Sequence, residues 1–84
     1  MHFMRIDKFL NAVNITKRRA IAEDMLKNSV VQINGAVAKK SKEVKIGDTI
    51  SIHYLEFTQK FEVLLIPTTK TTPKSQQHLY VKKF

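Results

Sequence analysis

The spacing of apolar residues changes once along this chain, and the change restricts the fold more than any other feature. Between residues 5 and 27 the apolar side chains recur every three or four positions, which is the period of one helix face. From residue 30 they alternate with polar ones, and Asn34-Gly35 supplies two turn residues that tolerate positive φ. The pattern predicts an α+β fold in which two helices precede a β-hairpin.

The helical part contains two separate helices. Its first apolar stripe predicts a short helix over about residues 5–13, with Asp7 in the first turn, where the helix dipole favours an acidic side chain. We predict that Thr16 caps a second helix, which runs to about residue 27. The expected buried stripe of this helix consists of Ile21, Ala22, Met25 and Leu26. The short connection predicts a helix-turn-helix unit, a geometry shared by DNA-binding and RNA-binding proteins.

Four further segments are predicted as strands. They are residues 31–33 and 36–38, which form the hairpin, then residues 49–54 and residues 61–66. A loop over residues 56–60 precedes the last strand, and Pro67 stops it. We therefore expect the two-helix unit to pack on a small, mostly antiparallel sheet of four or five strands.

The C-terminal part of the chain differs in composition from the rest. Residues 67–77 contain only Thr, Pro, Lys, Ser and Gln, so we predict a flexible surface segment. A last apolar patch follows, formed by Leu79, Tyr80, Val81 and Phe84. We expect this patch to dock on the sheet, with a mobile tail as the alternative. The predicted domain therefore covers residues 1–66, and residues 67–84 form a flexible segment and a C-terminal tail.

The charge of the chain favours a polyanionic partner. Fifteen Lys and Arg against seven Asp and Glu give a formal net charge of +8, and residues 1–45 hold ten of these basic side chains. Basicity alone is also compatible with DNA, an anionic membrane or plain solubility. Because the chain has no cysteine and no apolar stretch typical of a signal peptide or membrane span, we expect a cytoplasmic protein with no membrane partner.

Three basic clusters provide the candidate contact residues. They are Lys17, Arg18 and Arg19 in the predicted first turn of the second helix, Arg5 and Lys8 on the first helix, and Lys39, Lys40 and Lys42 after the hairpin. Cations at a helix N-terminus oppose the helix dipole, so a bound phosphate would explain their position. Two alternatives stay open, because Arg19 can simply pair with Glu23 and Lys8 can be an ordinary solvated lysine.

No catalytic or metal-binding motif accompanies these clusters. His2, His53 and His78 lack the spacing of metal ligands, and the two glycines form no phosphate-binding loop. No nucleophile is paired with an oriented base. We expect no enzyme activity, no metal and no cofactor. Aromatic residues are sparse on the expected basic face, which argues against a stacking platform for single strands there.

Four motifs resemble a known family. They are MRIDKFL at residues 4–10, KRRAIA at 17–22, VQING at 31–35 and VKIGD at 44–48. In this order and spacing they resemble the S-four RNA-binding domain, named after a small-subunit ribosomal protein and also called the alpha-L motif. The short chain is most similar to the stand-alone bacterial members, the heat-shock protein fifteen and RqcP group. One departure is Ser29, which stands where the family usually has glycine. We expect Asn28 to adopt the left-handed conformation in its place.

The resemblance implies a function as well as a fold. It implies a non-catalytic, monomeric protein that contacts large-subunit ribosomal RNA and tRNA on the large ribosomal subunit, in ribosome-associated quality control. The residues that it implicates are Arg5, Asp7, Lys8, Lys17 and Arg19, with Asp7 orienting a neighbouring arginine. Two other hypotheses remain, namely a DNA-binding helix-turn-helix regulator and an RNA-targeting module for a modification enzyme acting in trans.

Overall fold

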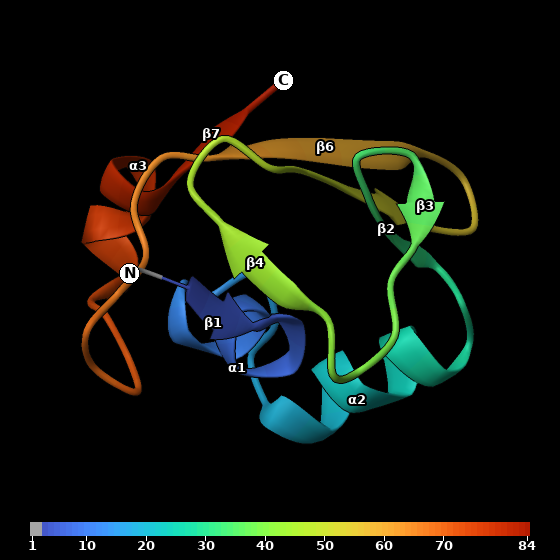
Figure 1. Ribbon diagram of the computed structural model, residues 1–84, viewed down its shortest axis with the longest axis horizontal. Helices are drawn as coiled ribbons and strands as arrows, with labels where there is room; N and C mark the ends of the chain where they lie inside the picture. Colours follow the sequence, from blue (N-terminus) through green and yellow to red (C-terminus); the bar gives the residue numbers. More distant parts are fainter. Residues whose placement is uncertain (1–2) are drawn as a thin grey trace.

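The computed structural model describes residues 3–84, and these form helices and antiparallel sheets (Figure 1). In chain order the elements are β1 (Phe3–Arg5), α1 (Ile6–Ala12), α2 (Arg19–Lys27), β2 (Val31–Ile33), β3 (Ala36–Val37), β4 (Glu43–Lys45), β5 (Thr49–His53), β6 (Thr58–Val63), the 3-10 helix η1 (Lys74–Gln76), α3 (Gln77–Tyr80) and β7 (Val81–Lys83). One sheet has the strand order β3-β2-β5-β6-β7, and β1 pairs with β4 in a second. The predicted α+β class, with a two-helix unit on a five-stranded antiparallel sheet, is confirmed.

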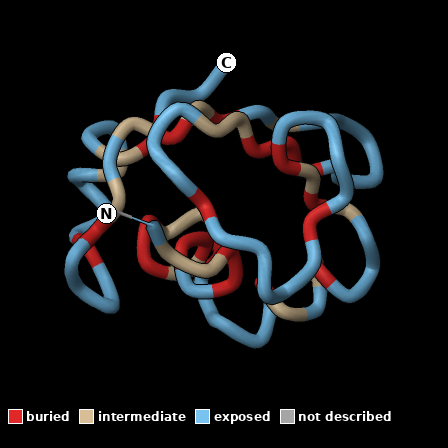
Figure 2. Tube along the Cα trace, in the orientation of Figure 1, coloured by how far each residue is buried: buried red, intermediate tan, exposed pale blue. Residues whose placement is uncertain are grey.

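The core lies between α1 and the five-stranded sheet. Ile6, Phe9 and Leu10 of α1 are fully buried, because they follow the helical spacing of the sequence. Ile50 and Ile52 of β5 meet them from the sheet, since alternate residues of a strand point to the same face. Figure 2 shows this burial concentrated in α1 and the sheet, while most loops are exposed. Within residues 3–84, no helix has the length and apolar character needed to cross a membrane.

The two predicted turns are present and are tied together. Asn34 and Gly35 have φ values of 53° and 85°, and Gly47 has 93°. The Asn34 side chain donates from Nδ2 to Oδ1 of Asp48 (3.1 Å) and accepts from the Thr49 backbone N–H (3.0 Å). One carboxamide therefore holds the hairpin turn against the turn that opens β5.

The start of the second helix differs from the prediction. Arg18, in extended conformation, occupies the N-cap position, and no side chain caps the helix. Thr16 is instead buried, and its backbone N–H donates to the Leu10 carbonyl, which continues the turn after α1. Lys17 and Arg18 thus precede the helix, and only Arg19 lies in its first turn. Ile21, predicted as buried, is exposed, whereas Ala22 and Leu26 of the same predicted stripe are buried.

The β5–β6 connection is also tighter than predicted. His53 pairs with Thr58, and the Tyr54 backbone N–H donates to the Phe57 carbonyl at 2.8 Å. The predicted loop over residues 56–60 is therefore wrong, because β6 starts at Thr58. Residues 64–66, predicted as strand, leave β6 before Pro67. Phe57 and Thr58 are both exposed, so the alternation of buried and exposed residues does not mark the start of this strand.

The segment predicted to be flexible is anchored to the first helix. Thr72 is buried, and both its hydroxyl (2.8 Å) and its backbone N–H (3.0 Å) donate to the Ala12 carbonyl. The chain then runs through α3 into β7, which pairs antiparallel with β6. The domain limit at residue 66 stays a prediction. His2, one of the three histidines considered for a metal site, lies outside the described residues.

Candidate nucleic-acid interface

Asp7 holds two arginines, Arg5 at the end of β1 and Arg19 at the start of α2. Its side chain is fully buried, with 0% of its surface exposed. Oδ2 accepts hydrogen bonds from Nη2 of Arg5 (3.1 Å) and Nη2 of Arg19 (3.3 Å), and Oδ1 accepts from the Lys8 backbone N–H (2.9 Å). A buried carboxylate needs such partners, because desolvation of an unpaired charge is strongly unfavourable. The predicted contact of Asp7 with an arginine is therefore present, with two arginines rather than one.

Both arginines remain accessible despite these bonds. The Arg5 and Arg19 side chains are 42% and 49% exposed. Each guanidinium carries five N–H donors. The bond to Asp7 orients the planar guanidinium group and uses only some of these donors. The arrangement holds two cations from different elements in place while leaving donors for an outside ligand.

A second carboxylate extends this network to the loop between β3 and β4. Oε1 of Glu23 lies 3.6 Å from Nε of Arg19 and 3.1 Å from Nζ of Lys40. Figure 1 shows that loop reaching α2. The alternative pairing of Arg19 with Glu23 is thus present together with the Asp7 contact. We call Arg5, Asp7, Arg19, Glu23 and Lys40 the Asp7 network. Its three cations and two carboxylates leave a net positive charge.

The first strand pair explains why the loop lies there. Arg5 pairs with Glu43 across β1 and β4, and the Ile6 backbone N–H donates to the Lys42 carbonyl at 2.7 Å. These bonds fix the start of α1 against the end of the basic loop. Such short strands carry no hydrophobic period of their own, so the sequence did not predict this pairing.

Two hollows adjoin the Asp7 network. One is lined by Lys8 and Arg19 together with Thr68, Thr69 and Lys70 of the anchored C-terminal segment. Lys70 was not among the predicted contact residues, because the composition of its segment indicated flexibility. Its position beside Lys8 adds a cation that only the tertiary structure reveals.

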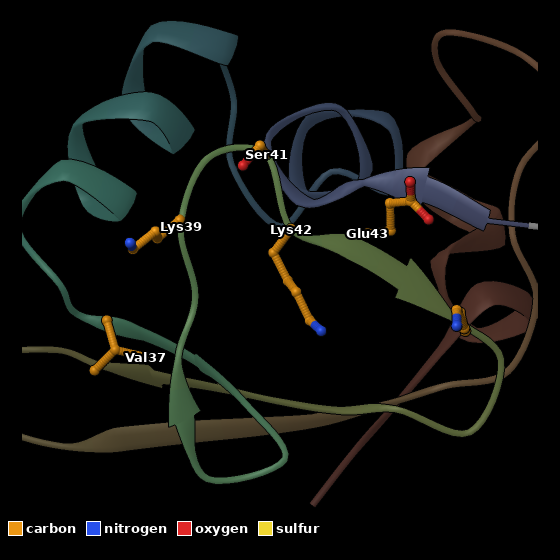
Figure 3. Close-up of a pocket in the computed structure, with 6 residues that line it drawn as sticks. Val37, Lys39, Ser41, Lys42 and Glu43 are labelled. Atoms are coloured by element: carbon orange, nitrogen blue, oxygen red, sulfur yellow. The ribbon is translucent and has the colours of Figure 1, made fainter.

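The other hollow lies in the loop that follows β3. Figure 3 shows Lys39 and Lys42 around it, with Ser41 at the bend of the loop and Lys42 extended into the space beside β4. Lys45 also lines this hollow, and Glu43 is its one acidic residue. Two lysines of the loop and one of β4 form a surface that suits phosphate oxygens.

Not all predicted residues converge. The structure brings together Arg5, Lys8, Arg19 and Lys40 with the supporting Asp7, and it places Lys39 and Lys42 on the adjoining loop. Lys17 and Arg18 are exposed before α2, and Thr16 is internal. Within residues 3–84 there is no group of three or more His, Asp or Glu side chains arranged to hold a metal ion.

Comparisons with known proteins agree with this arrangement. The family model described as the S4 domain matches residues 4–50. The chain is 51% identical over 78 residues to the RQC P-site tRNA stabilizing factor of Helicobacter pylori, covering 93% of each chain. It is 35% identical over 74 residues to the factor of the same name from Bacillus subtilis, covering 88% of this chain and 83% of the relative.

A solved structure supports the same assignment. The trimeric heat shock protein 15 of Vibrio cholerae superposes with a TM-score of 0.86 at 26% identity, covering 98% of this chain and 82% of that one. The family match spans more than half of the chain, and both relatives cover most of its length. The chain therefore belongs to the S4 domain family, in the group that contains the RQC P-site tRNA stabilizing factors.

Proposed function

We propose that this protein binds structured RNA without catalysing a reaction, and that it contacts large-subunit ribosomal RNA and tRNA during ribosome-associated quality control. The observation that carries the proposal is the Asp7 network, in which one buried carboxylate holds two half-exposed arginines from different elements. The names of the relatives support the tRNA and the quality-control pathway. A cytoplasmic location and a monomeric state on the large subunit belong to the same proposal.

The affinity comes mainly from contacts with phosphates. Arg5, Arg19 and Lys40 are the cations of the Asp7 network. Lys8 and Lys70 line the hollow that includes Arg19, and Lys39 and Lys42 lie on the same loop as Lys40 (Figure 3). Contacts of this kind position a protein on RNA but do not read base sequence. Selectivity follows from the shape of the folded RNA backbone, because the deep groove of A-form RNA hides its base edges.

The direct test removes both arginines of the network. Arg5→Ala combined with Arg19→Ala should abolish co-sedimentation with large ribosomal subunits that carry peptidyl-tRNA. A matched control is Lys60→Ala combined with Lys82→Ala, which removes the same charge from the outer face of β6 and β7. The control should still co-sediment. Equal co-migration of both double variants would reject the network as the RNA site, provided that circular dichroism shows both folded.

The DNA-binding alternative is less well supported. A recognition helix in the major groove would have to be α2, and that helix presents Glu23 and Asp24 to solvent or to its partners. Insertion into the major groove would bring these acidic groups between the phosphates of both strands, whereas contact through Arg5, Arg19 and Lys40 does not require α2 to enter a groove. Displacement of structured ribosomal RNA by duplex DNA at equal nucleotide concentration would reverse this judgement.

A further inference from the structure

The inner face of the five-stranded sheet continues beyond the helices that cover it. Ile52 on β5 and Phe61 on β6 are buried on this face. Alternation along the strands carries the same face on to Tyr54 and Phe57 at the β5–β6 turn. There the helix layer has ended, and Tyr54 and Phe57 are 41% and 59% exposed. A folded domain rarely leaves neighbouring aromatic rings in water without a use for them.

These two rings pack against each other. Their centroids lie 4.8 Å apart with an interplanar angle of 31°. The backbone hydrogen bond from Tyr54 to Phe57 closes the turn that carries them. Both contacts restrict the two side chains, which lowers the entropy lost when a ligand stacks on them.

The rings line a groove that other parts of the chain complete. Its other lining residues include Gln59 on β6 and Lys83 on β7, and Lys74 and Gln77 at the start of the last helical segment. Figure 1 shows α3 at the other end of β6 from the β5–β6 turn, so the groove joins residues from both ends of this strand. Among the described residues that line it, none is acidic, and the two lysines give it a positive charge.

The amide side chains of the groove have a defined orientation. Nε2 of Gln77 donates to the Val13 carbonyl at 2.8 Å, and Nδ2 of Asn14 donates to the Thr72 carbonyl at 2.8 Å. Nε2 of Gln59 donates to the Lys60 carbonyl at 3.2 Å. Carbonyl oxygens only accept hydrogen bonds, so the NH2 group of each amide makes these contacts. None of the three amide oxygens accepts a hydrogen bond from the described residues, which leaves them as acceptors for a ligand.

We propose that this groove binds a short single-stranded stretch of RNA. One base stacks on the Tyr54 and Phe57 rings, and the backbone runs along β6 so that Lys83 and Lys74 contact its phosphates. The amide oxygens accept from exocyclic amino groups, which adenine has and uracil lacks. This combination of aromatic faces and cations is the one that binds unpaired strands. The proposal rests on the proposed RNA-binding function but uses none of the residues of the Asp7 network.

The sequence argued against a stacking platform on the basic face, because aromatic residues are sparse among the basic clusters of the N-terminal half. The groove lies outside those clusters. Tyr54 and Phe57 come from the β5–β6 turn, and Lys74 and Lys83 come from the C-terminal segment. Only the folded chain brings them to one surface.

Fluorescence anisotropy with a labelled octamer of adenosine ribonucleotides tests the stacking. Tyr54→Leu combined with Phe57→Leu keeps the apolar bulk but removes the π faces, and should weaken binding by about tenfold, the low to middle range for loss of stacking. The matched control is Phe84→Leu, an exposed aromatic residue beyond β7 that does not line the groove. The control should bind like the wild type, and an octamer of uridine should bind the wild type more weakly.

A second pair of variants tests the charges. Lys74→Ala combined with Lys83→Ala should weaken the octamer and lower the log–log salt slope by about 0.7 per lost phosphate contact. Lys60→Ala combined with Lys82→Ala removes equal charge outside the groove and should leave the slope nearer to that of the wild type. Equal slopes for the two double variants would overturn the phosphate contacts.

Two further outcomes would overturn the proposal. One is unchanged octamer affinity in the Tyr54 and Phe57 double variant. The other is a change in the sedimentation coefficient of that variant alone, which would identify the face as a contact between copies of the chain. The arginine double variant of the Asp7 network should still bind the octamer. The octamer assay can therefore reject the groove as a single-strand site without rejecting the Asp7 network as the ribosome-binding site, and the reverse also holds.

Discussion

At the scale of single residues, a substitution of Asp7 distinguishes the effect of net charge on RNA binding from the effect of holding the arginines in place. Asp7→Asn raises the net charge of the chain by one, so a purely electrostatic view predicts tighter RNA binding. We expect weaker binding instead, because an amide holds Arg5 and Arg19 less firmly than the buried carboxylate does. The free energy of unfolding should also fall by about 1–3 kcal/mol, from the loss of charge-assisted hydrogen bonds. RNA titration and urea denaturation measure the two effects.

The control for Asp7 lies on α2. Asp24→Asn gives the same change in charge at an exposed position whose side chain forms no ion pair with the described residues. It should leave stability almost unchanged and bind RNA at least as well as the wild type. Tighter binding by the Asp7 variant as well would show that Asp7 does not position the arginines.

Glu23, unlike Asp7, is expected to weaken RNA binding. Its carboxylate forms ion pairs with Arg19 and Lys40 and so competes with a phosphate for both cations. Glu23→Gln should therefore raise RNA affinity by a few fold, while stability changes by less than about 1 kcal/mol, because both ion pairs are exposed. Binding measured beside the Asp24→Asn variant distinguishes release of these two cations from a general gain of charge. An equal gain in both variants would exclude a specific role for Glu23.

At the scale of elements, the end of α2 has a backbone conformation that suits glycine. Ser29 has a φ of 60°, whereas Asn28 stays at −86°. The expectation that Asn28 would adopt the left-handed conformation is therefore wrong, since Ser29 itself adopts it. A left-handed conformation is unfavourable for residues with a Cβ atom, by about 1–2 kcal/mol.

Replacing this serine should stabilise the protein. We expect Ser29→Gly to raise the free energy of unfolding by about 1 kcal/mol, because the relief of strain exceeds the extra entropy of glycine in the unfolded chain. The melting temperature should rise by roughly 4–8 °C. Asn34→Gly is the contrasting variant, because Asn34 also has positive φ but its side chain links two turns. It should give no gain, and equal stabilisation of both variants would contradict this explanation.

The elements that the sequence predicted correctly are those with local signals. The spacing of Ile6, Phe9 and Leu10 places α1 within one residue at either end, and Asn34-Gly35 forms the hairpin turn. The start of α2 was wrong, because Thr16 satisfies local capping rules while its backbone is needed for the turn after α1. The pairing of β1 with β4 is non-local, so no window of sequence contains it.

At the scale of the whole molecule, the candidate site depends on contacts between distant parts of the chain. The sequence identified Arg5, Arg19 and Lys40, together with the contact of Asp7 with an arginine and the alternative pairing of Arg19 with Glu23. It did not show that Asp7 holds both arginines or that Glu23 also reaches Lys40. Lys70 was missed because its segment has the composition of a flexible linker. Single hydrogen bonds such as those of Thr72 anchor that segment, and composition does not reveal them.

The same anchoring makes the C-terminal segment part of the folding unit. Thr72 and Gln77 satisfy the Ala12 and Val13 carbonyls at the end of α1, and Val81 is buried beside Val63 on β6. A chain ending at residue 66 would leave those carbonyls without these partners and expose the edge of β6.

We expect such a truncated chain to be largely unfolded at 25 °C, although it retains the whole region matched by the family model. The heteronuclear NMR spectrum of residues 1–66 measures this directly, and collapsed amide dispersion is the expected result. Thr72→Val in the complete chain is the milder companion, because it removes one hydroxyl donor and should lower stability by about 1 kcal/mol. A well-dispersed spectrum from residues 1–66 would instead show that the domain ends where the sequence alone placed its limit, with the last eighteen residues as an appendage.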